Sequence, residues 1–588
     1  MHFPFAYVGP GAGFAFLGSF LTLLLSLLAS LASLLLWPFR MFLRLLRRGR
    51  STRTAHVRKA IFLGLDGLDP ELTERLMAEG KLPNFARLKK QGSYRRLRAT
   101  CQALSPVAWS TFATGVNPAK HKGEPFWNIL GRHAVESTIL RVPVSFPLDG
   151  FKGRLLSATA TQGGFSYFTK HPGRTSFEGG NRYPLIEADG ALAGVLAGLG
   201  DSILFRIQDP EGDPVLDIQD GAYPLRPHEY TPWIRLKFGR VHGIVRFLLT
   251  QTGEDFSLYA TAVQIDPENP ATPISHPPYY ASYLAKLLGP FSTLGMAEDT
   301  SALNEGVIHE DDFLAQTKTI QGEREAMFFS ALDHQESGVV ACVFDTSDRI
   351  QHMFYRYLDP AHAAGKHSCA IERMYCDMDR LVGRTLEHAD RDTAVFVLSD
   401  HGFCSFRRGV NLNAWLHQNG YIALQNDEID WPRTRAYALG LSGVYLNLRG
   451  REAQGAVDPK DAAPLIAELI SRLAGLHDED SGEIAIRNVY AYPEAAPDLI
   501  VGYARGYRAS WDAARGKVSP CVFEDNVKAW SGDHCVDPAL VPGVLFSNRK
   551  LDADDPGIED LAPTALRLFG IQPPEWMEGK SVVHAKEP

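Results

Sequence analysis

Cysteine is scarce in this sequence, and its spacing suggests no cross-linked fold. Seven cysteines occur among 588 residues, an odd number, and no two of them form a CxxC pair. A disulfide framework or a structural zinc knuckle normally shows as paired cysteines at short spacing, so the sequence suggests neither. Free thiols favour a reducing compartment.

Long basic runs in the soluble part, internal repeats and low-complexity segments are also missing. A net charge of -8 without a basic run argues against a nucleic-acid partner, and the lack of a fixed period excludes a repeat architecture. The composition, 45% hydrophobic and 22% charged, is that of a globular protein. The chain is too long for one ordinary core, so we expect one large domain with an inserted part.

Charge is absent from Phe14 to Phe39, a run rich in leucine. The run exceeds the roughly 20 apolar residues that a membrane-spanning helix needs, and we interpret it as a single-pass anchor. A cleaved signal peptide would have basic residues before a shorter run, whereas only His2 precedes this one. A buried core helix is the alternative interpretation.

The flanks of this run predict its orientation. No arginine precedes the run, whereas several follow it closely. They are Arg40, Arg44, Arg47, Arg48, Arg50, Arg53 and Arg58. The positive-inside rule then predicts an inner-membrane protein with its catalytic domain in the cytoplasm. The stretch from Phe39 to Leu46 could also lie along the membrane surface as an amphipathic helix.

The stretch TAVFVLSDHGF, from Thr393 to Phe403, is the most informative part of the sequence. It opens with a near-continuous run of β-branched and aromatic residues, which is typical of a strand buried on both faces of a parallel sheet. Asp400 and His401 follow at the carboxyl end, where open α/β sheets bind ligands. Together they could bind a divalent cation. Ordinary turns and helix caps use similar residues, so this stretch alone leaves both interpretations open.

Two further segments carry candidate site residues. KAIFLGLDG, starting at Lys59, is a second apolar run that ends in a carboxylate, Asp66, although a plain turn would give the same pattern. Ser105 precedes Pro106 and a segment with helical patterning, so its hydroxyl is expected at a helix N-terminus, where backbone N–H groups favour an anion. Serine is also a common N-cap there. A cap serine beside a cation would be an activated nucleophile.

Together, five motifs in this order resemble the alkaline phosphatase superfamily, and more narrowly its type I phosphodiesterase and nucleotide pyrophosphatase branch. They are Asp66 after a strand, Ser105 in SPVAWSTFATGVNPAKHKG, Asp348 and His352 in DTSDRIQHMFYRYLD, Asp400 and His401 in VLSDHGF, and His534 in SGDHCVDPALVPGVLF. The resemblance runs from about Lys59 to near Gly579. Its last part, IEDLAPTALRLFGIQPP, resembles the family's closing helix.

The resemblance implies an α/β fold with a mixed, mostly parallel sheet between helices, and two divalent metal ions, usually zinc, at a nucleophilic Ser or Thr. One ion would be held by Asp66, Asp400, His401 and the Ser105 oxygen, and the other by Asp348, His352 and His534. The residues agree in one respect, because Asp348 and His352 are four apart and would share one helical face. Three protein ligands with an open position suit a catalytic zinc.

The sequence departs from the pattern of nucleotide pyrophosphatases at one point. That pattern has a phosphate-binding Asn shortly after a His-Gly pair, whereas Lys122 separates His121 from Gly123 here. Asn128 is the nearest candidate, and it could equally be a turn or capping residue. The sulfatase signature needs Pro and Arg two and four residues after the nucleophile. Val107 and Trp109 occupy those places, so sulfatase activity is not expected.

These patterns predict an organisation and a function. We expect an anchor with a basic flank (1–50) and a catalytic core in three parts (51–141, 341–424 and 528–588). Between these parts we expect two insertions. The first is a cap of short strands and loops that shapes the substrate region (142–340), and the second covers residues 425–527. The predicted function is two-metal-dependent hydrolysis of phosphate esters, of the phosphodiesterase type, through a phosphorylated or esterified Ser105. The expected substrate is a small-molecule or lipid-headgroup phosphate ester. The alternatives are a phosphoryl or headgroup transferase and a membrane-tethered binding protein with a vestigial metal site. The oligomeric state stays open.

Overall fold

A computed structural model describes residues 55–118, 123–146, 150–157, 163–362, 364–492 and 496–583. The chain divides into one unit of residues 1–55 with Pro588 and a compact unit of residues 56–587. The run from Phe14 to Phe39, predicted to span a membrane, lies outside the described residues. Within the part that the structure describes, no helix combines the length and apolar character of a membrane span.

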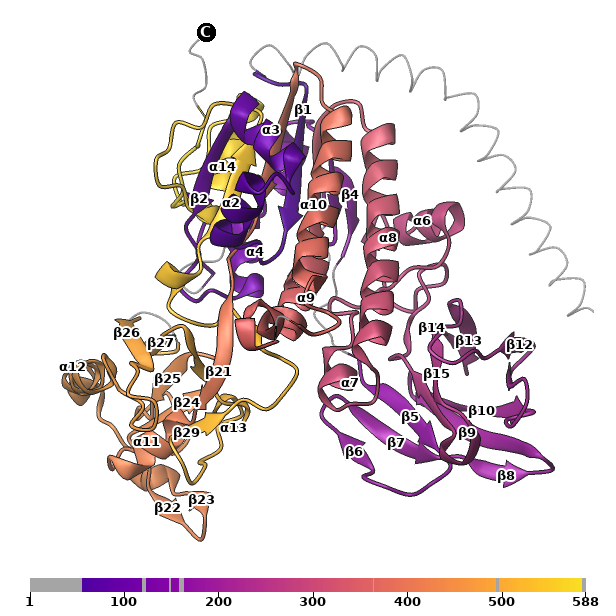
Figure 1. Ribbon diagram of the computed structural model, residues 1–588. Coiled ribbons are helices and arrows are strands. Elements are labelled where there is room, and N and C mark those ends of the chain that lie inside the picture. The colour runs from indigo at the N-terminus through magenta and orange to yellow at the C-terminus, as the bar shows by residue number, and fades with distance from the viewer. Residues whose placement is uncertain are drawn as a thin grey trace, which may run out of the picture. The chain divides into compact units, whose positions relative to one another are not determined.

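In the large unit, the described residues form an eight-stranded mixed sheet in the order β18-β4-β3-β19-β1-β20-β31-β2 (Figure 1). The strands are β18 (Ser275–His276), β4 (Gly153–Leu156), β3 (Ser137–Leu140), β19 (Gly338–Phe344), β1 (Lys59–Leu65), β20 (Thr393–Leu398), β31 (Gly543–Ser547) and β2 (Ser93–Leu97). The central strand β1 pairs in parallel with β19 and β20, and every residue of these three is buried. The predicted buried parallel strands and the mixed α/β fold are confirmed.

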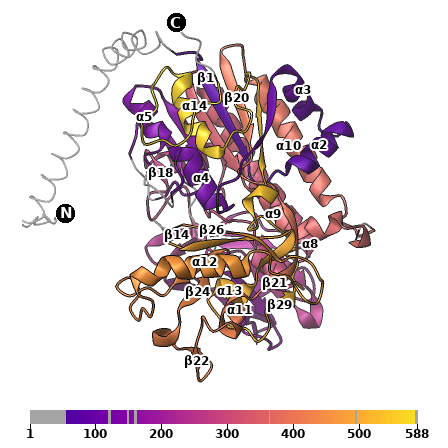
Figure 2. The ribbon, with the colours of Figure 1, turned by 90° about the vertical axis from the view of Figure 1, so that its left-hand side faces the viewer.

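Helices cover both faces of this sheet. Figure 2 shows α4 (Ser105–Thr114), α5 (Phe126–Arg132) and α14 (Leu561–Leu568) on one face, and α2 (Pro70–Ala78), α3 (Pro83–Gln91) and α10 (Ala370–Glu387) on the other. Successive side chains of β1 point to opposite faces. Phe62 packs on Phe112 of α4 with ring centroids 5.7 Å apart, while Ile61 and Leu63 join the core that contains Met378 of α10. Both faces of the central strands are therefore closed to water.

Helix α2 begins directly after Asp69, close to the end of β1. Asp69 is the N-cap of α2 and its carboxylate accepts a hydrogen bond from the Leu72 N–H at 2.9 Å. Pro70 occupies the first helical position, where a missing N–H costs no hydrogen bond.

The segment 142–340 supplies strands to the main sheet as well as sheets of its own. β4 and β18 lie within it, and α8 (Glu310–His334) packs against β19 and β3. Its remaining strands form sheets in the orders β12-β11-β10-β9-β8, β13-β14-β17 and β15-β16-β5-β7-β6. They span β5 (Phe165–Thr169), β6 (Ser176–Phe177), β7 (Gly180–Pro184), β8 (Ile186–Ala188), β9 (Ala191–Gly198), β10 (Asp201–Gln208), β11 (Val215–Ile218), β12 (Gly221–Pro224), β13 (Ile234–Phe238), β14 (Val241–Val245), β15 (Phe247–Gln251), β16 (Ser257–Ala260) and β17 (Gln264–Ile265). Short strands were expected here; α6 (Tyr280–Leu288), α7 (Thr300–Asn304) and the long α8 were not.

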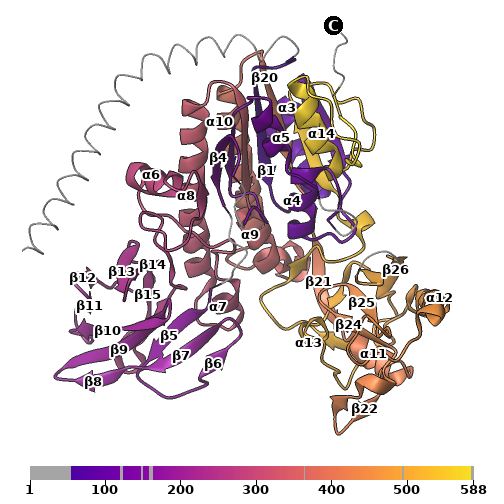
Figure 3. The same ribbon diagram turned by 180° about the vertical axis from the view of Figure 1, so that it is seen from behind.

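The segment 425–527 also has its own sheet, in the order β24-β25-β27-β26. Figure 3 labels β24, β25 and β26 of this sheet. These strands are β24 (Ala436–Leu439), β25 (Gly443–Leu446), β27 (Leu499–Tyr503) and β26 (Ile486–Ala491), with α12 (Ala462–Leu473) packed against β26. A second small sheet pairs β28 (Gly506–Ala509) and β29 (Phe523–Asp525) with β21 (Cys404–Val410). Because β21 follows His401 in the chain, this segment is tied by hydrogen bonds to a strand that leaves the predicted site.

Candidate active site

Three adjacent parallel strands bring the predicted carboxylates to one edge of the main sheet. Asp66 follows β1 directly, Asp400 comes two residues after the end of β20, and Asp348 lies in the first turn of α9 (Thr346–Phe354), which follows β19. All three are at least 98% buried. Since parallel neighbours end at the same edge, residues far apart in sequence meet there.

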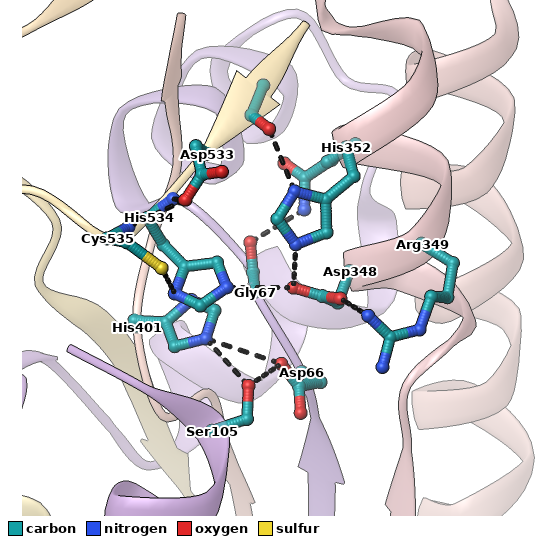
Figure 4. Close-up of polar contacts among 12 residues, drawn as sticks. Asp66, Gly67, Ser105, Asp348, Arg349, His352, His401, Asp533, His534 and Cys535 are labelled. Atoms are coloured by element: carbon teal, nitrogen blue, oxygen red, sulfur yellow. Dashed lines mark hydrogen bonds and ion pairs between the residues drawn. The ribbon is translucent and has the colours of Figure 1, made fainter. Parts of the chain in front are cut away.

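Ser105 contributes its hydroxyl from the first residue of α4 (Figure 4). Its Oγ lies 3.0 Å from His401 Nε2 and 3.3 Å from Asp66 Oδ1. The interpretation of Ser105 as an ordinary cap is not confirmed, because Leu104 is the N-cap residue and α4 has no side-chain cap hydrogen bond. The serine oxygen therefore faces the carboxylates and imidazoles, at a helix N-terminus as predicted.

His352 and His534 complete the cluster around Asp348. His352 shares the face of α9 with Asp348, and its Nε2 lies 3.2 Å from Asp348 Oδ1. The Nε2 of His534 lies 3.6 Å from the same oxygen. The rings of His534 and His401 stack with centroids 3.6 Å apart, which links the two halves of the site. All seven residues predicted from the sequence are thus in one cluster.

The three histidines are held in the same way. Nδ1 of His352 lies 2.8 Å from the Gly532 carbonyl, Nδ1 of His534 lies 2.7 Å from the Ala103 carbonyl, and Nδ1 of His401 lies 3.1 Å from the Gly402 carbonyl. A carbonyl only accepts hydrogen bonds, so each Nδ1 carries the proton and each Nε2 presents a lone pair to the cluster. This arrangement is usual for histidines that bind metals.

Burial and crowding of negative charge change the acidities in the cluster. Burial, the Asp400 carboxylate and the Asp348 carboxylate raise the pKa of Asp66 well above its usual value. Burial and the Asp348 carboxylate raise the pKa of Asp400 to about 7. Burial and the neighbouring His534 lower the pKa of His401, which favours its neutral form. These carboxylates are therefore costly to ionise together unless a cation joins them.

Two residues that the sequence interpretation missed support the carboxylates. Trp109 of α4 donates a hydrogen bond from Nε1 to Asp66 Oδ2 at 2.8 Å, and Arg349 donates from Nη1 to Asp348 Oδ2 at 2.7 Å. Burial opposes ionisation of Asp348, but the positive charge of the neighbouring Arg349 favours it, and the pKa of Asp348 stays below its usual value. Arg349 directly follows Asp348 in the chain, and only this adjacency in the sequence could have indicated that it supports the Asp348 carboxylate. Nothing comparable in the sequence indicated Trp109.

Gly64→Ala is expected to disturb the site through Trp109. A Cβ at position 64 would lie 2.4 Å from Trp109 Cη2 and 3.0 Å from Val343 Cγ2, and Trp109 is fully buried. Overpacking of this kind costs about 1–3 kcal/mol, and it would push the indole away from Asp66. Thermal unfolding would measure the loss. Gly322→Ala is the matched control, because a Cβ there meets nothing within 4 Å, and alanine in a helix should add up to about 1 kcal/mol. Equal unfolding temperatures for the two variants would contradict this prediction.

The donor set fits divalent cations. Among the described residues, the ligand atoms of Asp66, Asp400 and His401 lie within 4.8 Å of one another, as do those of Asp348, His401 and His534. Asp348 Oδ1 and Asp400 Oδ2 are buried and accept no hydrogen bond from described residues, and each lies 3.2 Å from an imidazole Nε2. Two acceptors that face each other in a buried site are compatible if a cation lies between them. The structure groups His401 with both sets, whereas the prediction placed it in one.

Comparison with known proteins identifies the family. The model of the type I phosphodiesterase / nucleotide pyrophosphatase family matches residues 60–122 and 248–517. The chain belongs to this family. Type I phosphodiesterases / nucleotide pyrophosphatases are metal-dependent enzymes, and this chain is accordingly a metal-dependent phosphoester hydrolase. The predicted membership and enzyme class are confirmed.

Solved structures similar to this phosphodiesterase family member have low sequence identity to it. Phosphonoacetate hydrolase from Sinorhizobium meliloti 1021, in complex with phosphonoformate, is 11% identical with a TM-score of 0.44, and the match covers 89% of this chain and 98% of that one. Murine ectonucleotide pyrophosphatase / phosphodiesterase 5 is 11% identical with a TM-score of 0.38, over 88% of this chain and 96% of that one. No curated protein matches.

The departure from the nucleotide pyrophosphatase pattern involves His121 and Asn128, of which Asn128 is the candidate for phosphate binding. His121 lies outside the described residues. Asn128 lies in α5, which packs against β3 and α14, and its role in binding phosphate stays a prediction.

Proposed function

We propose that this family member is a two-metal phosphodiesterase in which Ser105 is the nucleophile and zinc the native ion. The contact of Ser105 Oγ with His401 Nε2, at 3.0 Å within a buried carboxylate and imidazole cluster, carries the proposal. Ligand assignment follows the sequence prediction. Asp66, Asp400, His401 and Ser105 would hold one ion, and Asp348, His352 and His534 the other.

The proposed reaction depends on positive charge that the site holds beside the Ser105 oxygen. Two divalent cations, when bound, supply positive charge that favours the Ser105 alkoxide and stabilises charge on the attacking and leaving oxygens. Ser105 Oγ, after its proton has passed to solvent, forms a bond to phosphorus while the bond to the leaving alcohol breaks, and the alcohol departs with a proton from solvent. Water cleaves the Ser105 ester in a second displacement, which restores the hydroxyl. His401 needs no role as a base, because its Nδ1 carries a proton held by the Gly402 carbonyl and its Nε2 lone pair would be used to bind the metal ion.

Zinc fits the donors better than magnesium does. The cluster combines imidazole nitrogens with carboxylate oxygens, and imidazole is a good ligand for zinc, whereas magnesium prefers oxygen ligands and water. Restoring activity to the metal-free chain with each ion in turn would test this choice.

A direct assay tests the proposed function. The full-length chain, solubilised in detergent and stripped of metal by a chelator, would be supplied with Zn²⁺ and given bis(4-nitrophenyl) phosphate beside 4-nitrophenyl phosphate. We expect metal-dependent hydrolysis, faster with the diester. A preference for the monoester would overturn the diesterase assignment, and no hydrolysis of either would count against the whole proposal. The transferase alternative predicts a phosphorylated acceptor when a small alcohol is added, which product analysis would detect.

Zinc affinity is expected to rise about tenfold between pH 6 and pH 8. Burial and Asp348 raise the pKa of Asp400 to about 7, so at pH 6 a proton occupies most of this carboxyl and must leave before zinc binds. At pH 8 the Asp400 carboxyl is already mostly ionised, so a proton no longer competes with zinc for it. Calorimetric titration of the metal-free chain at both pH values would measure the change, and buffers of different ionisation enthalpy would count the protons released. An affinity that does not change with pH would contradict this prediction.

The membrane assignment is part of the proposal. The uncharged run from Phe14 to Phe39 and the arginines after it support a single-pass anchor with the catalytic domain in the cytoplasm. An anchored enzyme meets substrates at the membrane surface, which favours a lipid headgroup or another small phosphate ester. Protease accessibility of the catalytic domain in closed inner-membrane vesicles of known orientation would test the predicted side.

A further inference from the structure

The loop Trp530–His534, which includes the two-residue strand β30 (Gly532–Asp533) paired with β21, contacts both histidines that we assign to one metal ion. It carries His534 itself, and its Gly532 carbonyl accepts the Nδ1 proton of His352. The Ser531 N–H donates to the His352 carbonyl at 2.7 Å, and the Trp530 ring lies against the His352 ring with centroids 3.8 Å apart. The conformation of this loop therefore fixes where both imidazoles point.

The Asp533 side chain helps to fix the conformation of the loop, together with the backbone pairing of β30 with β21. Its Oδ1 accepts hydrogen bonds from the N–H groups of His534 and Cys535, both at 2.8 Å, and its Oδ2 accepts one from Trp530 Nε1 at 2.8 Å. The side chain is almost fully buried. A buried carboxylate needs a partner charge as well as hydrogen bonds, because burying it alone is very costly.

That partner charge comes from the segment 425–527. Arg508 of β28 is 1% exposed, and its Nε lies 2.9 Å from Asp533 Oδ2. Two aromatic rings hold the guanidinium in place, Phe406 at 4.6 Å and Trp511 at 4.2 Å from the ring centroids. The Trp511 ring in turn meets Trp530 edge to face at 5.8 Å. Arg508 is thus connected to the loop through its charge and through the aromatic side chains.

We propose that Arg508 is a positioning residue for the metal site, acting on His352 and His534 through Asp533 and Trp530. It also keeps Asp533 from binding metal itself, since Asp533, His534 and Cys535 have ligand atoms close enough to share an ion. The segment 425–527 then has a role in the chemistry, because it supplies the charge that sets the geometry of one ion. This inference rests on the proposed assignment of His352 and His534 as ligands.

Arg508→Met in the full-length chain tests the proposal. Methionine keeps an unbranched apolar side chain and removes the charge, and we expect zinc to bind ten- to a hundredfold more weakly, as is usual when a residue behind a metal ligand is lost. Competition against a chromophoric chelator would measure the affinity. With cobalt(II) in place of zinc, the visible absorption bands should shift, because they report the ligand geometry. Arg407→Met is the matched control, since Arg407 lies on the neighbouring strand β21, is 59% exposed and pairs with exposed Glu483; its zinc affinity and cobalt spectrum should not change.

Two further variants complete the test. Arg508→Met with Asp533→Asn removes the unpaired buried carboxylate and should recover part of the lost affinity; it also provides the measurement if Arg508→Met alone does not fold. His534→Ala distinguishes a failure of the positioning role of Arg508 from a failure of the ligand assignment. If His534→Ala weakens zinc binding while Arg508→Met and the double variant bind as tightly as the unchanged chain, the positioning role is wrong and the ligand assignment stands. If His534→Ala has no effect on zinc binding, the ligand assignment itself fails.

Discussion

Ser105→Ala is expected to lower phosphodiester hydrolysis by at least about a thousandfold while zinc still binds. Removing a nucleophile that forms the covalent intermediate typically costs several orders of magnitude in kcat. Six other predicted ligands stay in place, so the ions should lose only one oxygen donor. Steady-state kinetics with bis(4-nitrophenyl) phosphate and metal analysis of the same preparation would measure both effects.

Two variants control this experiment. Ser105→Thr keeps a hydroxyl at the same place and should retain measurable activity. Ser110→Ala removes a hydroxyl from the same helix, α4, outside the cluster, and should behave like the unchanged chain. Activity of Ser105→Ala above a few per cent of the original would show that another group attacks phosphorus.

Asp400→Asn is expected to reduce bound zinc from two ions to one and to lower kcat/KM by about a thousandfold or more. The substitution keeps the shape of a fully buried side chain and removes its negative charge. An amide is a weak ligand, and its NH₂ group would compete for the oxygens that now face the site. Metal content after dialysis, together with kinetics, would measure the change.

A buried carboxylate outside the cluster provides the control for Asp400→Asn. Asp379 is 2% exposed, and it accepts hydrogen bonds from the N–H groups of Asn84 and Phe85 and from the Asn84 side chain. Asp379→Asn should lower the free energy of unfolding by about 1–3 kcal/mol and leave the zinc content unchanged. If Asp400→Asn kept both ions, Asp400 would not be a ligand.

Much of the candidate site could be predicted because several of its parts have a local signal, whereas His534 was predicted from the family resemblance alone. A continuous apolar run that ends in Asp66 or in Asp400 and His401 indicates a buried strand and its carboxyl end within a few residues. Asp348 and His352 show their common helical face through a spacing of four. Such signals depend on short-range geometry, which a sequence displays directly.

The supporting contacts had no such signal. His534 Nδ1 meets the carbonyl of Ala103, 431 positions away, and Trp109 reaches Asp66 only because α4 packs over β1. Nothing near Arg508 in the sequence indicates that its guanidinium pairs with Asp533. The position of β4 and β18 in the main sheet was equally hidden, because short strands between turns look alike whichever sheet they join.

The sequence by itself determined the family, the α/β fold with buried parallel strands, and the seven residues that form the cluster. Strand ends and helical spacing are encoded locally, and the family motifs that point to Ser105 and His534 can be found in the sequence directly. Only the tertiary structure decided how the cluster is held: which carbonyls fix the histidine protons, which carboxylate oxygens lack a donor, and how Arg508 reaches the metal site. Those features arise from packing between distant segments, where the free energy depends on what each side chain meets in space.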